Sequence, residues 1–351
     1  MGKSTKVRVG AIGPGGAGRH RTLVMSRDPA VEIVAATDTN PDCIKALEDA
    51  LGHKVQSFIG PDGYRKMIDT VPLDAVGIYS PHTLHYEHAM YALTHGKHVL
   101  IEKPMVCGVG RALETAKLAA KKGLVYLIHY QRHFEPMYIQ ARQMIRKGVI
   151  GAVKSFYVFM AQDWSGFSWR GDPKYSGGGQ INDSGSHYQD ILIWMTGLLP
   201  KSVEGHIDYY YRGEKKRVPM NGSFMVELSN GAAGRLVILS DIIGGFVDDV
   251  RIQGEKGTLV LRGGSVWLHK PGKNEPKEFK PKLPRGYPLN PCDNFIKLIT
   301  GRTKVNHVPA IFGARVALLT DALLLSGETG KRVYCDRLIA KAGYNMKDLE
   351  D

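Results

Sequence analysis

A glycine-rich hexapeptide, Gly13 to Gly18, constrains the fold of this chain more than any other segment. It fits the pattern G-x-G-x-x-G, follows the apolar run Val7 to Ile12 directly and precedes a helical segment. The first glycine of such a loop permits a tight turn, the second lets the backbone approach a pyrophosphate, and the third lets helix and strand pack closely. The N-terminus of the following helix offers N–H groups to phosphates. The pattern predicts a dinucleotide site built on Gly13, Gly15, Gly16 and Gly18.

An acidic residue at the end of the next apolar run makes this prediction more specific. Asp38 closes the run that begins at Glu32, twenty residues after Gly18. A carboxylate there can accept hydrogen bonds from both ribose hydroxyls of an adenosine, and it would repel a 2′-phosphate. We therefore expect NAD as the cofactor, with NADP the less favoured alternative because Arg19 or Arg21 could reach a phosphate.

The first 130 residues alternate short apolar runs with helical periodicity, which predicts βαβ units and a parallel sheet. The strands are almost continuously apolar, as expected when helices cover both faces of a sheet. Strands are expected at Val7–Ile12, Glu32–Thr37, Leu73–Tyr79, His98–Ile101 and Val125–His129. Helices are expected at Asp42–Leu51, His82–Thr94 and Arg111–Lys122.

After about residue 150 the pattern changes, because β runs follow one another through turns rich in Gly and Asn. Strands are expected at Val153–Ala161, Val203–Tyr211, Ser223–Leu228, Ala232–Ser240, Val250–Gln253, Gly257–Leu261 and Ser265–His269. Two helices, at about Asp293–Thr300 and Ala310–Gly327, are expected to close the chain. The predicted fold class is α/β. Residues 1–130 are expected to form an N-terminal doubly wound Rossmann domain that binds NAD. Residues 131–351 are expected to form a C-terminal α+β domain with an open, mainly antiparallel sheet, for substrate binding and oligomerisation.

Composition excludes several classes of protein. The 351 residues are 43% hydrophobic and 23% charged, which is typical of a soluble globular protein of two domains. The net charge is +13, but the basic residues are scattered and the densest basic stretch, Lys270 to Arg285, is broken by prolines. We therefore expect no nucleic acid partner. The four cysteines are far apart and form no CxxC, and the histidines form no spaced ligand set, so no disulfide framework and no metal are expected.

The N-terminal residues lack the features of a signal peptide, and no apolar run approaches the length of a membrane span. We expect a cytoplasmic protein with no membrane partner.

The segment Glu102-Lys103-Pro104 ends a predicted strand and strongly resembles the glucose–fructose oxidoreductase / inositol dehydrogenase (Gfo/Idh/MocA) family. Other segments match that family in the right order, and together the matches extend over most of the chain. They are Ser80-Pro81-His82 with His85, Tyr130 to Phe134, Gly177 to His187, and Ala322 to Val333. One departure is His82, which stands where the family usually has asparagine.

The chemistry of a dehydrogenase explains why these residue types matter. A base must take the proton of a hydroxyl while a hydride leaves the same carbon, and a further group must stabilise the developing alkoxide. Lys103 follows a buried strand at its carboxyl end, where ligands bind in doubly wound folds. Desolvation and the charge of an oxidised nicotinamide would disfavour its ammonium form. Asp183 and His187 are spaced i, i+4, so both lie on one face if a helix starts near Ser184.

The resemblance implies that Lys103, Asp183 and His187 form the catalytic group. His187 is favoured as the base and Lys103 as the residue that binds the reacting oxygen, although family members differ on which residue takes the proton. Asp183 could also be the N-cap of the helix that carries His187.

Further site residues follow from the same comparison of segments. Cofactor contacts are expected from Ser80, Pro81, His82, His85, Glu102 and Lys103, with His85 and Glu102 lining the nicotinamide pocket. Substrate contacts are expected from Lys103, Gln131, Arg132, Trp169, Arg170, Asp183, His187 and Tyr287. Asp190 is interpreted as helix surface or junction structure.

The function expected is an NAD-dependent oxidoreductase acting on a CH–OH group of a sugar, polyol or sugar derivative. One alternative is a glycoside hydrolase or lyase that uses tightly bound NAD in a transient oxidation. A second alternative is a non-catalytic NAD-binding sensor or accessory subunit. The family often forms oligomers through the open face of the second sheet, so the resemblance implies a homodimer or homotetramer.

Overall fold

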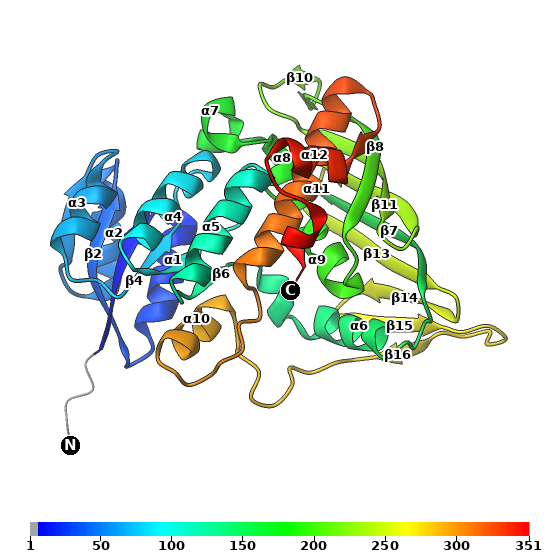
Figure 1. The fold of residues 1–351 in the computed structure, drawn as a ribbon, viewed down its shortest axis with the longest axis horizontal. Helices are drawn as coiled ribbons and strands as arrows, with labels where there is room; N and C mark the ends of the chain where they lie inside the picture. The colour runs from blue at the N-terminus through cyan, green and yellow to red at the C-terminus, as the bar shows by residue number, and fades with distance from the viewer. Residues whose placement is uncertain (1–5, 351) are drawn as a thin grey trace. The chain divides into compact units, whose positions relative to one another are not determined.

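The computed structural model describes residues 6–350, which divide into two compact units (Figure 1). The first unit contains the described residues up to Cys107, together with Arg111–Tyr130 and Pro288–Ala310. The second contains Gly108–Gly110, Gln131–Tyr287 and the chain from Ile311 onward. The chain therefore returns to the first unit after it has completed most of the second.

The first unit is built on a six-stranded parallel sheet in the order β3-β2-β1-β4-β5-β6. This is the strand order of a doubly wound fold, which confirms the predicted Rossmann class. Its strands are β1 Val7–Ile12, β2 Val31–Asp38, β3 Gln56–Ile59, β4 Ala75–Ile78, β5 His98–Ile101 and β6 Tyr126–Ile128. Its helical segments include α1 Gly16–Ser26, α2 Pro41–Leu51, α3 Gly63–Thr70, η1 His82–Leu84, α4 His85–Thr94 and α5 Val109–Lys121.

The central strands of this sheet are buried and apolar, whereas its edge strand β3 is not. Every residue of β4 is buried. β3 reads Gln-Ser-Phe-Ile, and none of its residues is buried. Because β3 lacks an apolar run, the sequence did not predict it.

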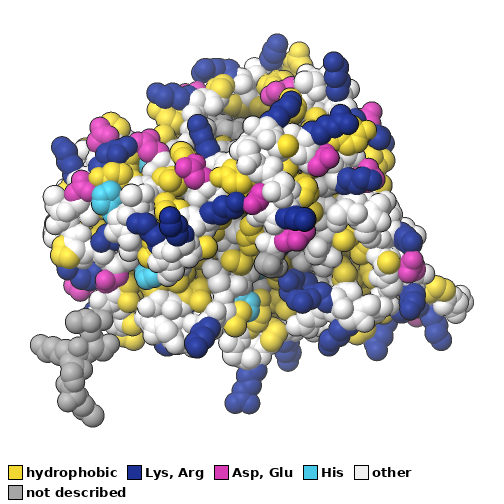
Figure 2. All heavy atoms as spheres, viewed as in Figure 1, with side chains coloured by type: hydrophobic (Ala, Val, Ile, Leu, Met, Phe, Trp, Pro, Cys, Tyr) yellow, Lys and Arg dark blue, Asp and Glu magenta, His cyan; other side chains and the backbone are white. Residues whose placement is uncertain are grey.

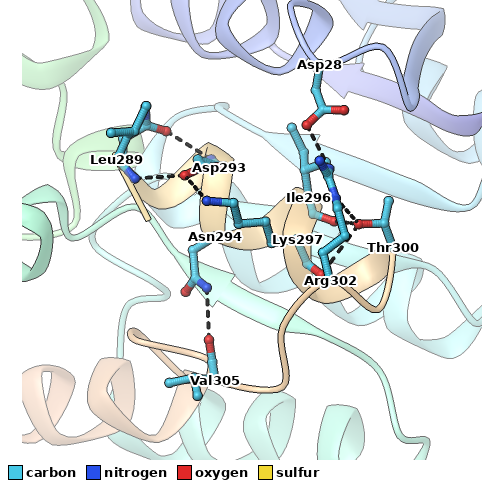
Figure 3. A network of polar contacts seen from close by, with 10 residues as sticks. Asp28, Leu289, Asp293, Asn294, Ile296, Lys297, Thr300, Arg302 and Val305 are labelled. Carbon is cyan, nitrogen blue, oxygen red and sulfur yellow. Dashed lines mark hydrogen bonds and ion pairs between the residues drawn. The ribbon is translucent and has the colours of Figure 1, made fainter. Parts of the chain in front are cut away.

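The returning segment, residues 288–310, is tied to the first unit by polar contacts and a helix (Figure 3). Helix α10, Pro291–Ile299, packs against α1, β5 and β6. Arg302 pairs with Asp28 at 2.7 Å, and the Asn294 amide donates to the Val305 carbonyl at 2.9 Å. The predicted helix at Asp293–Thr300 is therefore present, and it packs on the first sheet.

The second unit is built on a nine-stranded sheet in the order β16-β15-β14-β13-β7-β12-β11-β8-β17. Only β7 and β12 pair in parallel, so the expected mainly antiparallel sheet is confirmed. Its strands are β7 Val153–Gln162, β8 Pro200–Asp208, β11 Asn221–Leu228, β12 Ala233–Leu239, β13 Phe246–Gly254, β14 Gly257–Arg262, β15 Ser265–His269, β16 Lys277–Phe279 and β17 Val333–Tyr334. A separate hairpin pairs β9 Tyr210–Tyr211 with β10 Glu214–Lys215.

The helices of the second unit cover one face of this sheet, and there are more of them than the sequence predicted. They include η2 Gln131–Phe134, α6 Pro136–Arg146, η3 Ser168–Gly171, α7 Pro173–Ser176, α8 Gly179–Asn182, α9 Gly185–Thr196, α11 Ala310–Thr329, α12 Cys335–Lys341 and η4 Met346–Leu349. The expectation that two helices close the chain was wrong, because α12 and η4 follow them. Both are short, and α12 packs on β8, so tertiary contacts stabilise it more than its own periodicity does.

The expectation that no apolar run approaches the length of a membrane span was wrong for helix α11. Among residues 6–350 it alone is long and apolar enough to cross a membrane by length and composition. However, 72% of its most apolar stretch is buried inside the protein. Burial of this kind is typical of the core helix of a globular unit.

A buried carboxyl on α11 gives the second unit a pH-dependent stability. Asp321 accepts a hydrogen bond from the Val109 N–H, at the start of α5, at 2.8 Å. Burial raises the pKa of the Asp321 carboxyl from 3.8 to about 6. The folded state therefore holds this proton more tightly than the unfolded state does. The stabilisation that comes from the proton on Asp321 is complete below about pH 4 and is lost as the pH rises through about 6.

We expect Asp321→Asn to raise the melting temperature at pH 8, because an amide can accept the Val109 hydrogen bond without a buried charge. The gain is at most about 3 kcal/mol and should disappear near pH 4. Thermal unfolding of both proteins between pH 4 and pH 8 measures it. Asp336→Asn, the same change at an exposed position of α12, should have no such pH-dependent effect. An equal change of stability at both pH values for Asp321→Asn would contradict the interpretation.

Candidate functional site

The loop Gly13 to Gly18 has the geometry that a pyrophosphate needs. Gly13 has a φ of +76°, a conformation that side-chain-bearing residues rarely adopt. A Cβ on Gly18 would lie 2.4 Å from the Gly13 carbonyl oxygen and 2.8 Å from the Cβ of Tyr79. Helix α1 begins at Gly16 with no side-chain cap and no acidic residue in its first turn. Its first N–H groups and its positive dipole end therefore suit phosphate oxygens.

Asp38 lies at the carboxyl end of β2, on one side of β1 in the sheet. Its carboxylate accepts a hydrogen bond from the Asn40 N–H at 2.9 Å. Burial raises the pKa of this carboxyl above its usual range, although the Asn40 and Thr39 hydrogen bonds oppose the shift. An acceptor in this place suits the hydroxyls of a ribose.

His85 joins two loops on the other side of β1. Its Nδ1 lies 2.8 Å from the Pro104 carbonyl oxygen, and its Nε2 lies 2.8 Å from the Ser80 carbonyl oxygen. The ring is fully buried, and burial lowers its pKa. A neutral ring carries one N–H, so His85 donates to one of the two carbonyls at a time. The loops after β4 and β5 are thus bridged through one side chain.

The neighbours of His85 in the Ser80-Pro81-His82 segment are also largely enclosed. The Ser80 hydroxyl lies 2.8 Å from the Nδ1 of His88. His82 is 3% exposed, and its ring centroid lies 5.9 Å from that of His85. Pro81 precedes η1 in extended conformation and remains partly exposed.

Glu102 fixes the turn that carries Lys103. One carboxylate oxygen accepts a hydrogen bond from the Arg21 Nε at 3.0 Å, and the other accepts one from the Lys103 backbone N–H at 3.1 Å. The Lys103–Pro104 peptide bond is cis. Arg21 is therefore engaged with Glu102, which makes it a poor candidate for contacting a 2′-phosphate.

Two further buried residues adjoin Glu102, and sequence analysis missed both. His129, after β6, has its Nδ1 3.7 Å from Glu102 and its Nε2 3.9 Å from the Cys292 sulfur of α10. Burial opposes the charge of Glu102, but His129, Arg21 and Lys103 outweigh it and hold the pKa of the carboxyl below its usual range. Burial lowers the pKa of His129 to about 4, so its ring is neutral at pH 7.

Asp183 and His187 lie in the second unit, at the junction of α8 and α9. Ser184 is the N-cap residue of α9, and no side chain caps that helix, so the N-cap interpretation of Asp183 was wrong. Instead, one oxygen of the Asp183 carboxylate, Oδ2, accepts hydrogen bonds from Trp164 Nε1 at 3.0 Å and from Arg170 Nε at 2.9 Å. Trp164 had no spacing signal that linked it to Asp183, so the sequence could not reveal it. His187 is partly exposed in the first turn of α9.

The predicted substrate residues Trp169 and Arg170 lie together in η3. The Arg170 guanidinium carbon lies 4.4 Å from the Trp169 ring centroid and 5.1 Å from that of Phe167. Tyr287 is elsewhere in the second unit, where its hydroxyl donates to the His133 carbonyl at 3.0 Å. Tyr287 therefore holds η2 in place.

The remaining predicted residues belong to η2 and α9. Gln131 is exposed, whereas Arg132 donates to the Tyr188 hydroxyl at 3.1 Å. Asp190 is fully buried and contacts the Nε2 of His133 at 2.9 Å. Asp190 therefore lies buried between α9 and η2 and not on the helix surface.

The charged surface offers no concentrated basic patch on the viewed face (Figure 2). Lys and Arg side chains are spread over that face and interspersed with acidic ones. Among residues 6–350, no three His, Cys, Asp or Glu side chains are close enough together to hold a metal ion.

Comparison with known proteins gives the family. Residues 7–130 match the oxidoreductase family with an NAD-binding Rossmann fold, and residues 138–260 match the GFO/IDH/MocA C-terminal domain. The chain belongs to the Gfo/Idh/MocA family, and NAD as the cofactor class is confirmed.

Two curated relatives and one solved structure illustrate the likeness. The chain is 29% identical over 214 residues to D-glucoside 3-dehydrogenase of Escherichia coli, covering 58% of each protein. It is 26% identical over 205 residues to levoglucosan dehydrogenase of Pseudarthrobacter phenanthrenivorans, covering 54% of this chain and 51% of that protein. The chain thus spans about half the length of these curated relatives. A structure of levoglucosan dehydrogenase with NADH and levoglucosan superposes with a TM-score of 0.80 at 21% identity, covering 94% of this chain and 100% of that one.

We expect Gly18→Ala to destabilise the first unit and to weaken NAD binding at least about tenfold, because the new methyl group has no room beside the Gly13 carbonyl. Gly16→Ala is the matched control for stability, since a Cβ there meets no protein atom within 4 Å. Thermal unfolding of both variants without cofactor measures the destabilisation, and NAD titration of Gly18→Ala measures the loss of binding. If the two variants melted at the same temperature, the close approach at Gly18 would not be limiting.

Proposed function

We propose that this protein is an NAD-dependent oxidoreductase. It transfers a hydride between the nicotinamide and a hydroxyl-bearing carbon of a sugar, polyol or sugar derivative. One observation carries the proposal: Lys103 follows β5 with only Glu102 between them, at the same edge of the parallel sheet as the glycine loop that follows β1. The relatives named D-glucoside 3-dehydrogenase and levoglucosan dehydrogenase support the substrate class.

The strand order supports an orientation for the cofactor. Asp38 follows β2 and suits the adenosine ribose, whereas Ser80 and Lys103 follow β4 and β5 on the opposite side of β1. A dinucleotide whose pyrophosphate lies on the α1 N-terminus would then extend its nicotinamide toward β4 and β5. In this orientation Ser80, Pro81, His82, His85, Glu102 and Lys103 surround the nicotinamide end.

The roles of the chain's own groups follow from their chemistry. Bound NAD supplies a ring carbon that accepts or returns a hydride. The Lys103 ammonium donates a hydrogen bond to the reacting oxygen and stabilises negative charge on it. His187 takes the hydroxyl proton, and Asp183 balances the charge of the imidazolium. Gln131, Arg132, Trp169, Arg170 and Tyr287 are proposed to bind or frame the substrate in the second unit.

We expect the wild-type protein to reduce NAD with at least one member of a panel of sugars, glycosides, polyols and their acids, measured by the absorbance of NADH. Lys103→Met and His187→Ala should lower kcat/KM by about 10²- to 10⁴-fold, and His187→Ala should leave NAD binding intact. Lys121→Met and His206→Ala, at exposed positions, are the controls.

Other outcomes of this experiment distinguish the alternatives. Cleavage of a glycosidic bond without net NADH would identify a hydrolase or lyase and overturn the proposal. Full cellular function in Lys103→Met and His187→Ala strains would identify a sensor or accessory subunit.

We further propose a homodimer or homotetramer that forms through the open face of the second sheet. Tyr157 is 37% exposed there and lies between Arg235 and Arg251 on the adjacent strands. Met225 and Val260 extend this row on either side. A row of alternating arginine and apolar side chains suits a second copy related by a two-fold axis, because arginine can stack on the tyrosine of the other chain.

The four cysteines are free thiols, which favours a cytoplasmic location.

We expect Tyr157→Glu to convert the oligomer to a species with the mass of one chain, measured by light scattering after size exclusion. Ile59→Glu, the same kind of change at an exposed position of β3, should leave the oligomer intact. An oligomer of unchanged mass in Tyr157→Glu would rule out this face.

A further inference from the structure

The Asp183 carboxylate is held by two N–H donors that converge on a single oxygen. Trp164 Nε1 lies 3.0 Å from Oδ2, and Arg170 Nε lies 2.9 Å from it. The Asp183 side chain is 4% exposed and the Arg170 side chain 26%, so the bond from Trp164 is buried and the bond from Arg170 is partly buried. Charge-assisted hydrogen bonds of this kind are about twice as strong as neutral ones.

Both donors are fixed by parts of the fold that do not depend on Asp183. Trp164 follows β7, and its backbone N–H donates to the Ser240 carbonyl at 2.9 Å. Its ring packs in a buried cluster with Tyr211, Val218 and Met220. Arg170 belongs to η3, where its guanidinium lies over the rings of Trp169 and Phe167. The two donors lie on the same connection after β7, and each has contacts of its own besides Asp183.

The neighbouring acidic groups have partners of their own, so they do not compete for Arg170. Asp163 accepts hydrogen bonds from Tyr211 and Arg212. Asp172 accepts the Lys174 N–H at the start of α7 and lies 3.9 Å from Arg217.

The remaining charged groups near α9 are similarly arranged. Asp248 of β13 accepts the Tyr188 hydroxyl, and Asp190 contacts His133. His187 lies in the first turn of α9, four residues after Asp183. Arg170 is thus a cation bonded to Asp183, in the segment that precedes the proposed base.

We propose that Trp164 and Arg170 are positioning residues that keep Asp183 ionised and fixed in orientation, so that Asp183 is a permanent anion beside His187 and not a proton acceptor. Protonation of Asp183 would weaken two hydrogen bonds at once, a buried one from Trp164 and a partly buried one from the charged Arg170. The proton of the substrate hydroxyl therefore goes to His187 or Lys103. The catalytic meaning of this inference rests on the proposed function, whereas the ionised state of Asp183 does not.

The state of Asp183 can be measured without any substrate. The chain has four tryptophans, so a protein labelled with ¹⁵N at the indoles gives four indole N–H signals, and Trp164→Phe identifies the one from Trp164. We expect this signal to keep its shift from pH 8 to pH 5 in the wild type and to move in Asp183→Asn. In Arg170→Met its acid titration should begin at least about one pH unit higher. An unchanged signal in Asp183→Asn, or the same titration with and without Arg170, would overturn the proposal.

Activity supplies the second readout. Trp164→Phe keeps an aromatic side chain but replaces the indole with a benzene ring and so removes the N–H, and the acid limb of the kcat/KM profile should move up by about one pH unit while kcat falls about tenfold, with KM little changed. Arg170→Lys should restore most of the activity that Arg170→Met loses. Trp267→Phe, on β15, is the matched control. A loss in Trp164→Phe with no change in the pH profile would mean that the role is structural only and would reject the proposal.

The two readouts separate this inference from the proposed function. If the wild type oxidised no member of the substrate panel, the proposed function would fail. The indole titration would still decide whether Trp164 and Arg170 hold Asp183 as an anion.

Discussion

The close contact of α1 with the strands beneath it is the constraint on which the first unit depends. Gly18 packs where its missing Cβ would overlap both the Gly13 carbonyl and Tyr79, the residue that follows β4. That contact sets where the N-terminus of α1 lies against the sheet, and it also brings Arg21 of α1 to Glu102 at 3.0 Å. The helix that offers its N–H groups to a pyrophosphate is therefore the same helix that fixes the turn of Lys103. The position of α1 therefore affects both the predicted pyrophosphate site and the position of Lys103.

Single polar side chains also connect the loops at the carboxyl edge of this sheet. His85 contacts the backbone after β4 and after β5, and Glu102 contacts a side chain of α1 and the backbone of Lys103. Loops that must position reacting groups to within fractions of an ångström need such cross-links, because their own backbone hydrogen bonds are few. The His85 side chain is fully buried and that of Glu102 is 13% exposed, so these contacts are largely shielded from solvent.

Sequence patterns predicted the elements that depend on local periodicity. They missed residues whose contacts are with partners far away along the chain. The glycine loop, Asp38 and the apolar strands were predictable because each follows from neighbouring residues. β3 escaped prediction because Gln56 and Ser57 are polar and none of its residues is buried. Trp164 and Cys292 also escaped, because their partners Asp183 and His129 lie 19 and 163 residues away along the chain. The resemblance to a family supplied Lys103, Asp183 and His187 as a set, but it carried no information about what holds them.

The return of residues 288–310 to the first unit has a consequence for how the protein is made. Helix α10 covers β5 and β6 and brings Cys292 to His129, so the nucleotide-binding unit is complete only when residue 310 has been synthesised. A ribosome must therefore release most of the second unit before the first can close. During that interval the apolar surface beneath α10 is exposed to chaperones and to water. Chain order, and not only sequence composition, then sets the moment at which the nascent protein becomes able to bind its nucleotide.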